Sequence, residues 1–479
     1  MHIHIPEVLA PLIDRFQAHG QPLYLVGGSV RNALLSLPPS DIDVCGPAQP
    51  EEVMRLLDGS PIRVVPIAPA FGTIQLHIPA ADGAPSTVVE YTTFRSDRYD
   101  RGGTHRPAAV QFSHSLEHDA FRRDFSINAL YATLPDGEVI DPCGGLRDLA
   151  ARQLRTTSDH PGGILQDDAL RTLRLVRFGV ELGFGIEAAT FESAKHYAPQ
   201  LADIAVERIW KELKKILLGD VRYGAPQPGG QAAHERGLFM MLELGLLSHI
   251  FPELLEGQGI EQLSTYHAYD VLTHNLKTCG FSRPLLAVRL AALLHDVGKP
   301  RALRENGRML GHDRMGAGMA EQMLKRLKVD AVTTARTKQL VEVHMLDLNN
   351  NAKLRTLRKH FARMGAEMAA QFADIREADF LGSGKQSSPI ESAERYRTIL
   401  AGMLADGSPF SANELEIDGR EIAAAAGIAP GPLVGQIKHR LWMHCAAYPA
   451  DNHKRRLLRL AHHLAVTLQA SFPLDAPIK

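Results

Sequence analysis

The chain has 479 residues, of which 45% are hydrophobic, so it is a globular protein too long for a single core, and three or four domains are expected. Its 53 basic and 54 acidic residues nearly cancel, which excludes polyanion binding through overall charge and leaves only local patches for nucleic acid. The four cysteines lack the spacing of a zinc site or a disulfide framework, and neither a signal peptide nor a membrane span is evident. We expect a cytoplasmic protein without a membrane partner, and the sequence predicts no particular oligomeric state.

The first motif is an apolar strand that opens into a glycine turn. Residues 23–26 predict a buried strand, Gly27-Gly28-Ser29 predicts a sharp turn, and residues 30–37 predict a short helix. Glycines let the backbone approach a phosphate closely, while the helix start and Arg31 add positive potential. The turn is therefore predicted to bind a triphosphate.

Two aspartates follow this turn. Asp41 and Asp43 lie two residues apart in a predicted strand, so their carboxylates share one face. Oxygen ligands beside a phosphate site suit Mg²⁺, which would activate a 3′-hydroxyl and shield the leaving pyrophosphate. A glycine turn or an Asp-x-Asp alone is usually structural, but in strand-turn-helix-strand order the two resemble the signature of polymerase-β-like nucleotidyltransferases.

Further strands are predicted at residues 63–67, 72–78 and 87–93, which gives a small mixed sheet with helices on one side. Glu90 lies in the last of these strands, where it is either a third carboxylate, acting as metal ligand or base, or a solvated strand residue. Residues 95–107 are rich in arginine and glycine and predict a mobile loop that can meet a polyanion.

Residues 119–130 predict a helix. Asp124 and Asn128 are four residues apart, so they would share a helical face and reach one ribose together. Asp124 accepting a hydrogen bond from a 2′-hydroxyl would favour ribonucleotides over deoxyribonucleotides.

The head carries five motifs in a fixed order: Gly27-Gly28-x-Val30-Arg31, Asp41-x-Asp43, Thr93-Phe94-Arg95, Arg122-Arg123-Asp124-Phe125-x-Ile127-Asn128-Ala129 and Asp141-Pro142-x-Gly144-Gly145-x-x-Asp148-Leu149. Their order resembles that of class II tRNA nucleotidyltransferases, the CCA-adding enzymes, and of bacterial poly(A) polymerases. Asn32 departs from the pattern, because the family usually has aspartate there. The resemblance implies Mg²⁺ in the head, CTP and ATP as substrates, the tRNA 3′ end as partner, and nucleotide contacts from Arg123 and Arg174.

Residues 167–178 predict one amphipathic helix of the next region. Asp168 and Arg171 are three residues apart, which by itself predicts an ordinary helical salt pair. The segment also resembles the family's Glu-Asp-x-x-Arg helix, and this resemblance implies that the pair is a template for the incoming base. Cytosine and adenine both present an amino donor beside an unprotonated ring nitrogen, so one carboxylate and one guanidinium can pair with either.

A histidine-rich region follows. The adjacent His295 and Asp296 end an apolar run, and burying both requires a partner or a metal. Together with His267 and Asp379 they resemble an HD phosphohydrolase domain, which implies one or two divalent transition metals and hydrolysis of phosphoesters or cyclic phosphodiesters. His274 is an alternative to His267, and His312 and His344 follow at helix-like intervals.

The C-terminal part contains two basic clusters, in residues 353–363 and 454–456, which are candidates for contacts with tRNA phosphates. We expect an α+β protein: a small mixed-sheet, polymerase-β-like nucleotidyltransferase head, followed by an all-α neck, an HD domain and a tail. These four domains are expected at residues 1–145, 146–265, 266–380 and 381–479.

The predicted activity is template-independent addition of CCA to the tRNA 3′ end. Three alternatives stay open: a poly(A) polymerase, an enzyme that adds only CC or only A, and an HD metal phosphohydrolase whose head merely binds nucleotide or RNA.

Overall fold

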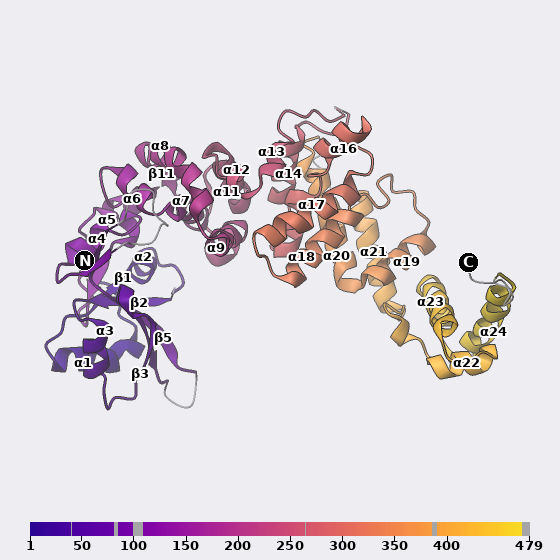
Figure 1. The fold of residues 1–479 in the computed structure, drawn as a ribbon, viewed down its shortest axis with the longest axis horizontal. Helices are drawn as coiled ribbons and strands as arrows, with labels where there is room; N and C mark the ends of the chain where they lie inside the picture. The colour runs from indigo at the N-terminus through magenta and orange to yellow at the C-terminus, as the bar shows by residue number, and fades with distance from the viewer. Residues whose placement is uncertain (40, 81–84, 99–108, 264, 386–389, 472–479) are drawn as a thin grey trace. The chain divides into compact units, whose positions relative to one another are not determined.

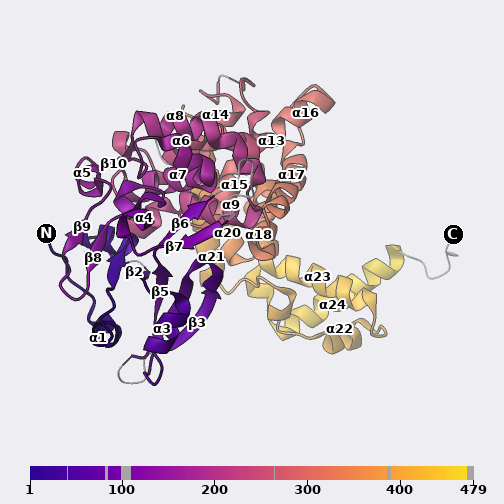
Figure 2. The same ribbon diagram turned by 60° about the vertical axis from the view of Figure 1, so that its left-hand side comes forward.

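A mixed sheet forms the centre of the N-terminal part of the chain, and within the described residues it has seven strands in the order β3-β4-β5-β2-β1-β8-β9 (Figure 1). The strands are β1 (Tyr24–Val26), β2 (Ile42–Gly46), β3 (Arg63–Ala68), β4 (Thr73–Ile78), β5 (Thr87–Thr93), β8 (Tyr131–Thr133) and β9 (Val139–Ile140). Figure 2 shows β3 and β9 toward opposite ends of this sheet. The parallel pair of β2 and β5 brings two segments far apart in the sequence into register.

The computed structural model describes residues 1–39, 41–80, 85–98, 109–263, 265–385 and 390–471. These residues divide into two units, residues 1–255 with 326–328, and residues 256–325 with 329–479. None of the described helices combines the length and hydrophobicity needed to cross a lipid bilayer.

Helices pack against the sheet through aromatic and aliphatic side chains. The ring of Phe16 on α1 (Ala10–Ala18) lies 5.8 Å from that of Tyr91 on β5, and both are buried. Gly27, between the end of β1 at Val26 and the start of α2 (Gly28–Leu34), has a φ of 70°, a backbone conformation that favours glycine. The other helices of the head are α3 (Pro50–Leu56), α4 (Leu116–Phe121) and α5 (Gly145–Ala150).

The single helix predicted over residues 119–130 is wrong. Helix α4 ends at Phe121, and a 3-10 helix covers Ser126–Asn128. Phe125 between them is extended, because its buried ring packs edge-on against Phe178 at 5.8 Å while its backbone forms a β-bridge with Thr156. Tertiary packing therefore overrides the local helical pattern.

The loop predicted over residues 95–107 begins instead as a strand. Residues Arg95–Arg98 form β6, which pairs with β7 (Ala109–Phe112). Residues 99–108, which make up the rest of that prediction, lie outside the described residues.

The neck is built from α6 (Pro161–Asp167), α7 (Leu170–Leu182), α8 (Ala188–Tyr197), α9 (Val206–Leu217), α10 (Gly219–Tyr223), α11 (Ala233–Glu243), α12 (Leu247–Ile250) and α13 (Pro252–Leu255). A buried ion pair between Arg177 and Glu212, 2.9 Å apart, joins α7 to α9. The all-α expectation needs one correction, since β10 (Gln153–Leu154) and β11 (Gly185–Ile186) form a short parallel pair. The fold class itself, a small mixed-sheet head before a mostly helical body, is confirmed.

Among the described residues of the second unit, every regular secondary-structure element is a helix. Its helices are α14 (Val271–Gly280), α15 (Leu286–Leu294), α16 (Lys299–Asn306), α17 (His312–Arg326), α18 (Ala331–Val343), α19 (Leu354–Met364), α20 (Ala366–Gly382), α21 (Glu391–Ala405), α22 (Gly419–Ala426), α23 (Pro432–Ala447) and α24 (Lys454–Ser471). The last three share an apolar core that includes Ile422, Leu441 and Leu457.

Candidate functional site

Three carboxylates converge at the start of β2. Asp43 and Glu90 are register partners on the parallel strands β2 and β5, so their side chains lie on the same face, and Asp41 immediately precedes β2. Burial and the charges of Glu90 and Asp41 raise the pKa of Asp43 to about 7, and burial together with Asp41 raises the pKa of Glu90. Such mutual repulsion is relieved by a divalent cation, and carboxylate oxygens are ligands that Mg²⁺ prefers. The residues present therefore fit the magnesium ion predicted from the sequence.

The glycine turn is tied to these carboxylates through Ser29. Its hydroxyl donates to the Asp41 carbonyl oxygen at 2.9 Å and accepts from the Asp43 amide at 3.4 Å. A Cβ placed on Gly27 would lie 3.8 Å from Nη1 of Arg123, so this guanidinium stands beside the turn. The structure thus brings Gly27, Gly28 and Ser29, which are predicted to bind the triphosphate, next to the predicted metal ligands. The guanidinium of Arg123 places a positive charge beside the turn.

The Arg31 side chain is buried and already hydrogen-bonded within the protein, unlike an arginine that is exposed to bind a phosphate. Its buried guanidinium donates to Asn128 Oδ1 at 2.5 Å and to Asn32 Oδ1 at 2.9 and 3.2 Å, and burial lowers its pKa. The Asn32 amide donates in turn to Pro38 O and to the hydroxyl of Tyr223. Asn32 therefore still provides the oxygen that an aspartate would offer to Arg31, and Arg31 supports the turn from behind. Its contact with triphosphate remains a prediction.

Asp124 and Asn128 do meet, although they are not on one helix. Asn128 Nδ2 donates to Asp124 Oδ1 at 3.1 Å, and Arg174 of α7 forms an ion pair with Asp124 Oδ2 at 2.5 Å. Although burial alone would raise the pKa of Asp124, Arg174 and the Asn128 amide hold it at about 2. Asp124 is thus ionised and joins the head to α7. Its contact with a ribose remains a prediction.

Asp168 and Arg171 do not form the helical salt pair. Helix α6 ends at Asp167, and Asp168 is extended (φ −146°, ψ 102°) before α7 begins at Leu170. Because of this break, Asp168 Oδ2 pairs instead with Arg208 of α9 at 2.6 Å. The buried Arg171 guanidinium donates to the carbonyl oxygens of Ile164 and Arg122, each at 2.9 Å. Other residues therefore hold both side chains in place: Arg208 holds the Asp168 carboxylate, and two backbone carbonyls hold the Arg171 guanidinium.

Asp119 is a central residue that the sequence did not single out. Its buried carboxylate accepts from Arg122 at 2.5 Å, from Arg123 at 2.8 Å and from the Tyr131 hydroxyl at 2.8 Å. Against the effect of burial, the two guanidinium groups hold its pKa at about 2. The available signal was an acid three and four residues before two arginines on a predicted helix. Asp119 fixes Arg123 beside the glycine turn.

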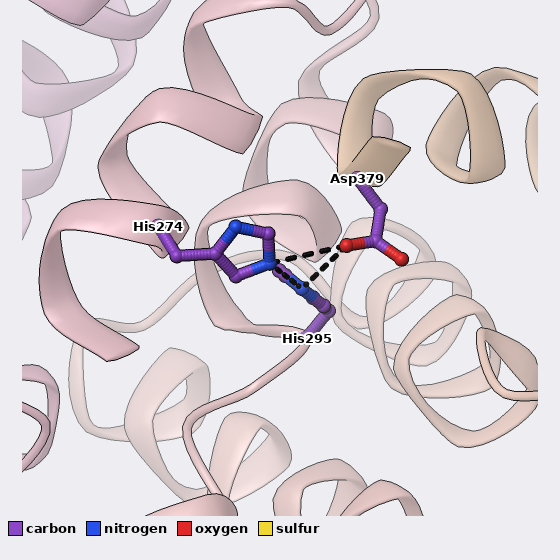
Figure 3. Close-up of side chains that lie close together, drawn as sticks. All are labelled: His274, His295 and Asp379. Carbon is purple, nitrogen blue, oxygen red and sulfur yellow. Dashed lines mark hydrogen bonds and ion pairs between the residues drawn. The ribbon is translucent and has the colours of Figure 1, made fainter. Parts of the chain in front are cut away.

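The histidine-rich region contains two groups of possible metal ligands among its described side chains. One consists of His274, His295 and Asp379 (Figure 3), the other of Asp296, His312 and His344, and within each group the ligand atoms lie within 4.8 Å of one another. Imidazole nitrogens with carboxylate oxygens suit a divalent transition metal, so these residues fit the predicted ion. Of the predicted set, His295, Asp296 and Asp379 belong to these groups.

His267 does not belong to either group. His274, the alternative that the sequence offered, belongs to the first group in its place. His274 lies in the first turn of α14, whereas His267 precedes that helix. The two rings are 4.6 Å apart, and burial and His274 lower the pKa of His267 to about 4. His267 is therefore a neutral neighbour of the cluster.

The basic clusters of the tail are partly used for structure. Arg358 on α19 is buried and donates to Asp406 at 2.8 Å and to the Ala446 carbonyl at 2.9 Å. Lys454 pairs with Glu421, and Arg456 lies 3.3 Å from Asp451. The exposed Lys353, Arg355 and Arg363 keep the first cluster a candidate for phosphate contacts.

Three families match successive parts of the chain. Residues 23–155 match the Poly A polymerase head domain, residues 183–225 match the probable RNA and SrmB-binding site of polymerase A, and residues 270–380 match the HD domain. The CCA-adding enzyme of Bacillus cytotoxicus is 41% identical over 43% of this chain, and the match spans 49% of that relative. The A-adding tRNA nucleotidyltransferase of Deinococcus radiodurans is 33% identical over 68% of this chain and 74% of the relative.

Solved structures share the fold along nearly the whole chain. The CCA-adding enzyme of Bacillus stearothermophilus in complex with CTP has a TM-score of 0.69 at 24% identity, covering 98% of this chain and 100% of that one. The Thermotoga maritima CCA-adding enzyme complexed with tRNA has a TM-score of 0.58 at 18% identity, with 96% of each chain covered. The head motifs, the HD region and the long match to the Deinococcus relative agree, and this chain belongs to the family of class II CCA-adding enzymes and poly(A) polymerases, with an HD domain.

Proposed function

We propose that this protein adds CCA to the 3′ end of tRNA from CTP and ATP, without a nucleic-acid template and with release of pyrophosphate. The observation that carries the proposal is the convergence of Asp41, Asp43 and Glu90 beside the turn that Ser29 ties to β2. Relatives named CCA-adding enzymes, with structures in complex with CTP, ATP and tRNA, support the same substrates for this chain. We also propose the four-domain division at residues 1–145, 146–265, 266–380 and 381–479.

The head supplies the chemistry of transfer. Asp41 and Asp43 would hold Mg²⁺, which lowers the pKa of the attacking 3′-hydroxyl and offsets the charge of the leaving pyrophosphate. Glu90 lies in register with Asp43, and it either completes the ligand set or accepts the proton of that hydroxyl. Arg123, which Asp119 holds beside the glycine turn, would offset the charge of the departing phosphates.

Base selection is assigned to Asp168 and Arg171. Because Arg208 holds the carboxylate and two backbone carbonyls hold the guanidinium, neither group has to be ordered when a nucleotide binds. A carboxylate acceptor and a guanidinium donor together would match the amino group and ring nitrogen of cytosine and adenine. Guanine and uracil present these groups in the reverse order and would meet like poles.

The Asp168→Ala variant is expected to lose base discrimination more than triphosphate binding. With tRNA as acceptor, the preference for CTP and ATP over UTP and GTP, measured as ratios of kcat/KM, should fall at least about tenfold, since one hydrogen bond to a charged group is worth about 1.5–3 kcal/mol. Glu192→Gln, which alters an exposed carboxylate on α8, is the matched control and should leave the ratios unchanged. Unaltered discrimination in Asp168→Ala would contradict the assignment.

A second candidate is addition of the terminal A alone. The observation in its favour is the A-adding Deinococcus relative, which aligns with 68% of this chain against 43% for the Bacillus enzyme. Two acceptors separate the candidates: one tRNA that lacks the whole CCA and one that already ends in CC. CCA addition predicts three nucleotides on the first, requiring both CTP and ATP, and one on the second. Extension of only the second would establish A addition, and a long ladder with ATP alone would mean a poly(A) polymerase.

We also propose that the HD region hydrolyses phosphoesters or cyclic phosphodiesters. Its six buried or nearly buried ligand-type side chains support a metal site, and the Lys299 ammonium beside Asp296 supplies a positive group for a phosphate. Water would attack phosphorus, and the P–O bond to the alcohol would break. Hydrolysis of 2′,3′-cyclic AMP, lost in His295→Ala and kept in Asp41→Ala, tests this activity separately from nucleotide transfer.

A further inference from the structure

We propose that Asn32 is a positioning residue for the sugar of the incoming nucleotide: through Arg31 it orients the Asn128 amide so that the N–H groups of that amide face the sugar site. This inference rests on the proposed nucleotide transfer and on the predicted contact of Asp124 and Asn128 with the ribose. Asn32 itself is buried on α2, so it acts only through its neighbours.

Both ends of the Asn32 amide are used within the protein. Its oxygen accepts from two nitrogens of the Arg31 guanidinium, Nη2 at 2.9 Å and Nε at 3.2 Å. Its Nδ2 donates to the Pro38 carbonyl oxygen at 2.8 Å and to the Tyr223 hydroxyl at 3.0 Å. A carbonyl oxygen only accepts hydrogen bonds and a guanidinium only donates them, so the Asn32 amide cannot turn over. Its oxygen is therefore fixed on Arg31.

The guanidinium of Arg31 in turn determines how Asn128 is oriented. With two of its nitrogens on Asn32, Arg31 donates from Nη1 to Asn128 Oδ1 at 2.5 Å. Its Cζ lies 5.2 Å from the centre of the Phe178 ring, so an aromatic face supports the guanidinium as well. Because arginine has no acceptor, the Asn128 side chain must present its oxygen to Arg31 and its nitrogen to the opposite side.

On that opposite side Asn128 meets a carboxylate. Nδ2 of Asn128 donates to Asp124 Oδ1 at 3.1 Å, and the Phe125 amide and Arg174 donate to the same carboxylate. Among the described residues only Asp124 accepts from this nitrogen, so its second proton is left for a ligand. A hydroxyl both donates and accepts, so a ribose 2′-hydroxyl can accept from Asn128 while it donates to Asp124.

The orientation of the Asn128 amide therefore decides what the site offers to a sugar. In the reverse orientation the Asn128 oxygen would face the Asp124 carboxylate and its N–H groups would face Arg31, so like poles would meet at both ends. The site would then present only acceptors to the 2′-hydroxyl, and a ribonucleotide would lose a hydrogen bond that a deoxyribonucleotide never makes. By fixing Arg31, Asn32 favours ribonucleotides without a contact of its own.

Equilibrium binding of CTP and dCTP to the full-length chain, with Mg²⁺ and without tRNA, measures this preference by isothermal titration calorimetry. In Asn32→Leu the preference for CTP, expressed as the ratio of the two Kd values, should fall about two- to tenfold, as expected for the loss of one uncharged hydrogen bond. The Kd of dCTP should stay near that of the parent. Asn32→Ser, whose short hydroxyl cannot meet both Nε and Nη2 of Arg31, gives the same test if leucine prevents folding.

Three further variants separate this role from simple support of the fold. Asn32→Asp keeps an oxygen for Arg31 but loses the donor to Pro38 and Tyr223, so its preference for CTP should equal that of the parent. Tyr223→Phe, the matched control, removes only the hydroxyl that Asn32 donates to, and it should also keep the preference. In the Asn128→Ala background, Asn32→Leu should lower the preference no further, because the amide that it orients is gone.

The outcomes distinguish this inference from the proposed transfer. An unchanged preference in Asn32→Leu, or an equal loss in Asn32→Asp, would leave Asn32 a purely structural residue and overturn the inference. Equal Kd values for CTP and dCTP in the parent would overturn it as well, while leaving nucleotide transfer intact. A parent that binds neither nucleotide would overturn the proposed transfer together with this inference.

Discussion

The Asp43→Asn variant is expected to transfer nucleotides at least about 10³-fold more slowly than the parent, which corresponds to about 4 kcal/mol of lost transition-state stabilisation. The amide keeps the size of the side chain but removes the charge that lies in register with Glu90 and two residues from Asp41. Since an ion held by these carboxylates would act on both the attacking and the leaving oxygen, its loss should affect kcat more than KM. Single-turnover extension of a tRNA lacking CCA, with Mg²⁺ and labelled CTP, measures the effect.

Asp14→Asn is the matched control for this prediction. Asp14 is an exposed carboxylate on α1 of the same head, so its replacement should change the rate less than twofold. If Asp43→Asn retained more than a tenth of the parent rate, the metal site would have to lie elsewhere, and the role given to Asp41 and Asp43 would be wrong.

The Asp119→Asn variant is expected to lower the free energy of unfolding by about 3–5 kcal/mol, because it leaves two arginines without their buried carboxylate. Asp119 is fully buried and accepts from Arg122, Arg123 and Tyr131. Urea unfolding at pH 7 measures the change. The nearby Glu117→Gln on the same helix is the control, and because Glu117 is exposed its effect should stay within about 0.5 kcal/mol.

The difference in the free energy of unfolding between the parent and Asp119→Asn should decrease as the pH falls. The pKa of Asp119 is about 2 in the folded chain, below its ordinary value of 3.8, so its charge stabilises the fold above pH 4. The stabilisation is lost as the pH falls from about 4 toward 2, and the gap between parent and Asp119→Asn should narrow over that range. If this difference in the free energy of unfolding stayed constant from pH 7 to pH 3, the charge of the Asp119 carboxylate would not be the source of the stabilisation.

The carboxylate site could be predicted because the residues that form it lie in short segments whose strand pattern can be read from the sequence alone. The period of two in a strand puts Asp41 and Asp43 on one face, and the β-branched and aromatic residues around Glu90 predict its strand. The parallel pairing of β2 and β5 that aligns Asp43 with Glu90 is a tertiary fact, which is why Glu90 remained ambiguous in the sequence.

The partners of the other site residues could not be predicted from spacing. Arg208 lies 40 positions beyond Asp168, and because of the break between α6 and α7 the Asp168 carboxylate pairs with Arg208 instead of forming a helical salt pair with Arg171. Similarly, Asp296 meets His344 only because α15, α17 and α18 end or begin at one place. Helical periodicity assigns a residue to a face, but only packing decides which faces meet.

Labelled-nucleotide incorporation into tRNA by Asp41→Ala, measured beside His295→Ala, tests most directly whether nucleotide transfer belongs to the head. Asp41→Ala is expected to incorporate no detectable label, and His295→Ala is expected to incorporate as much as the parent chain. Incorporation by Asp41→Ala at the parent rate, or its loss in His295→Ala with the fold intact, would mean that nucleotide transfer does not belong to the head.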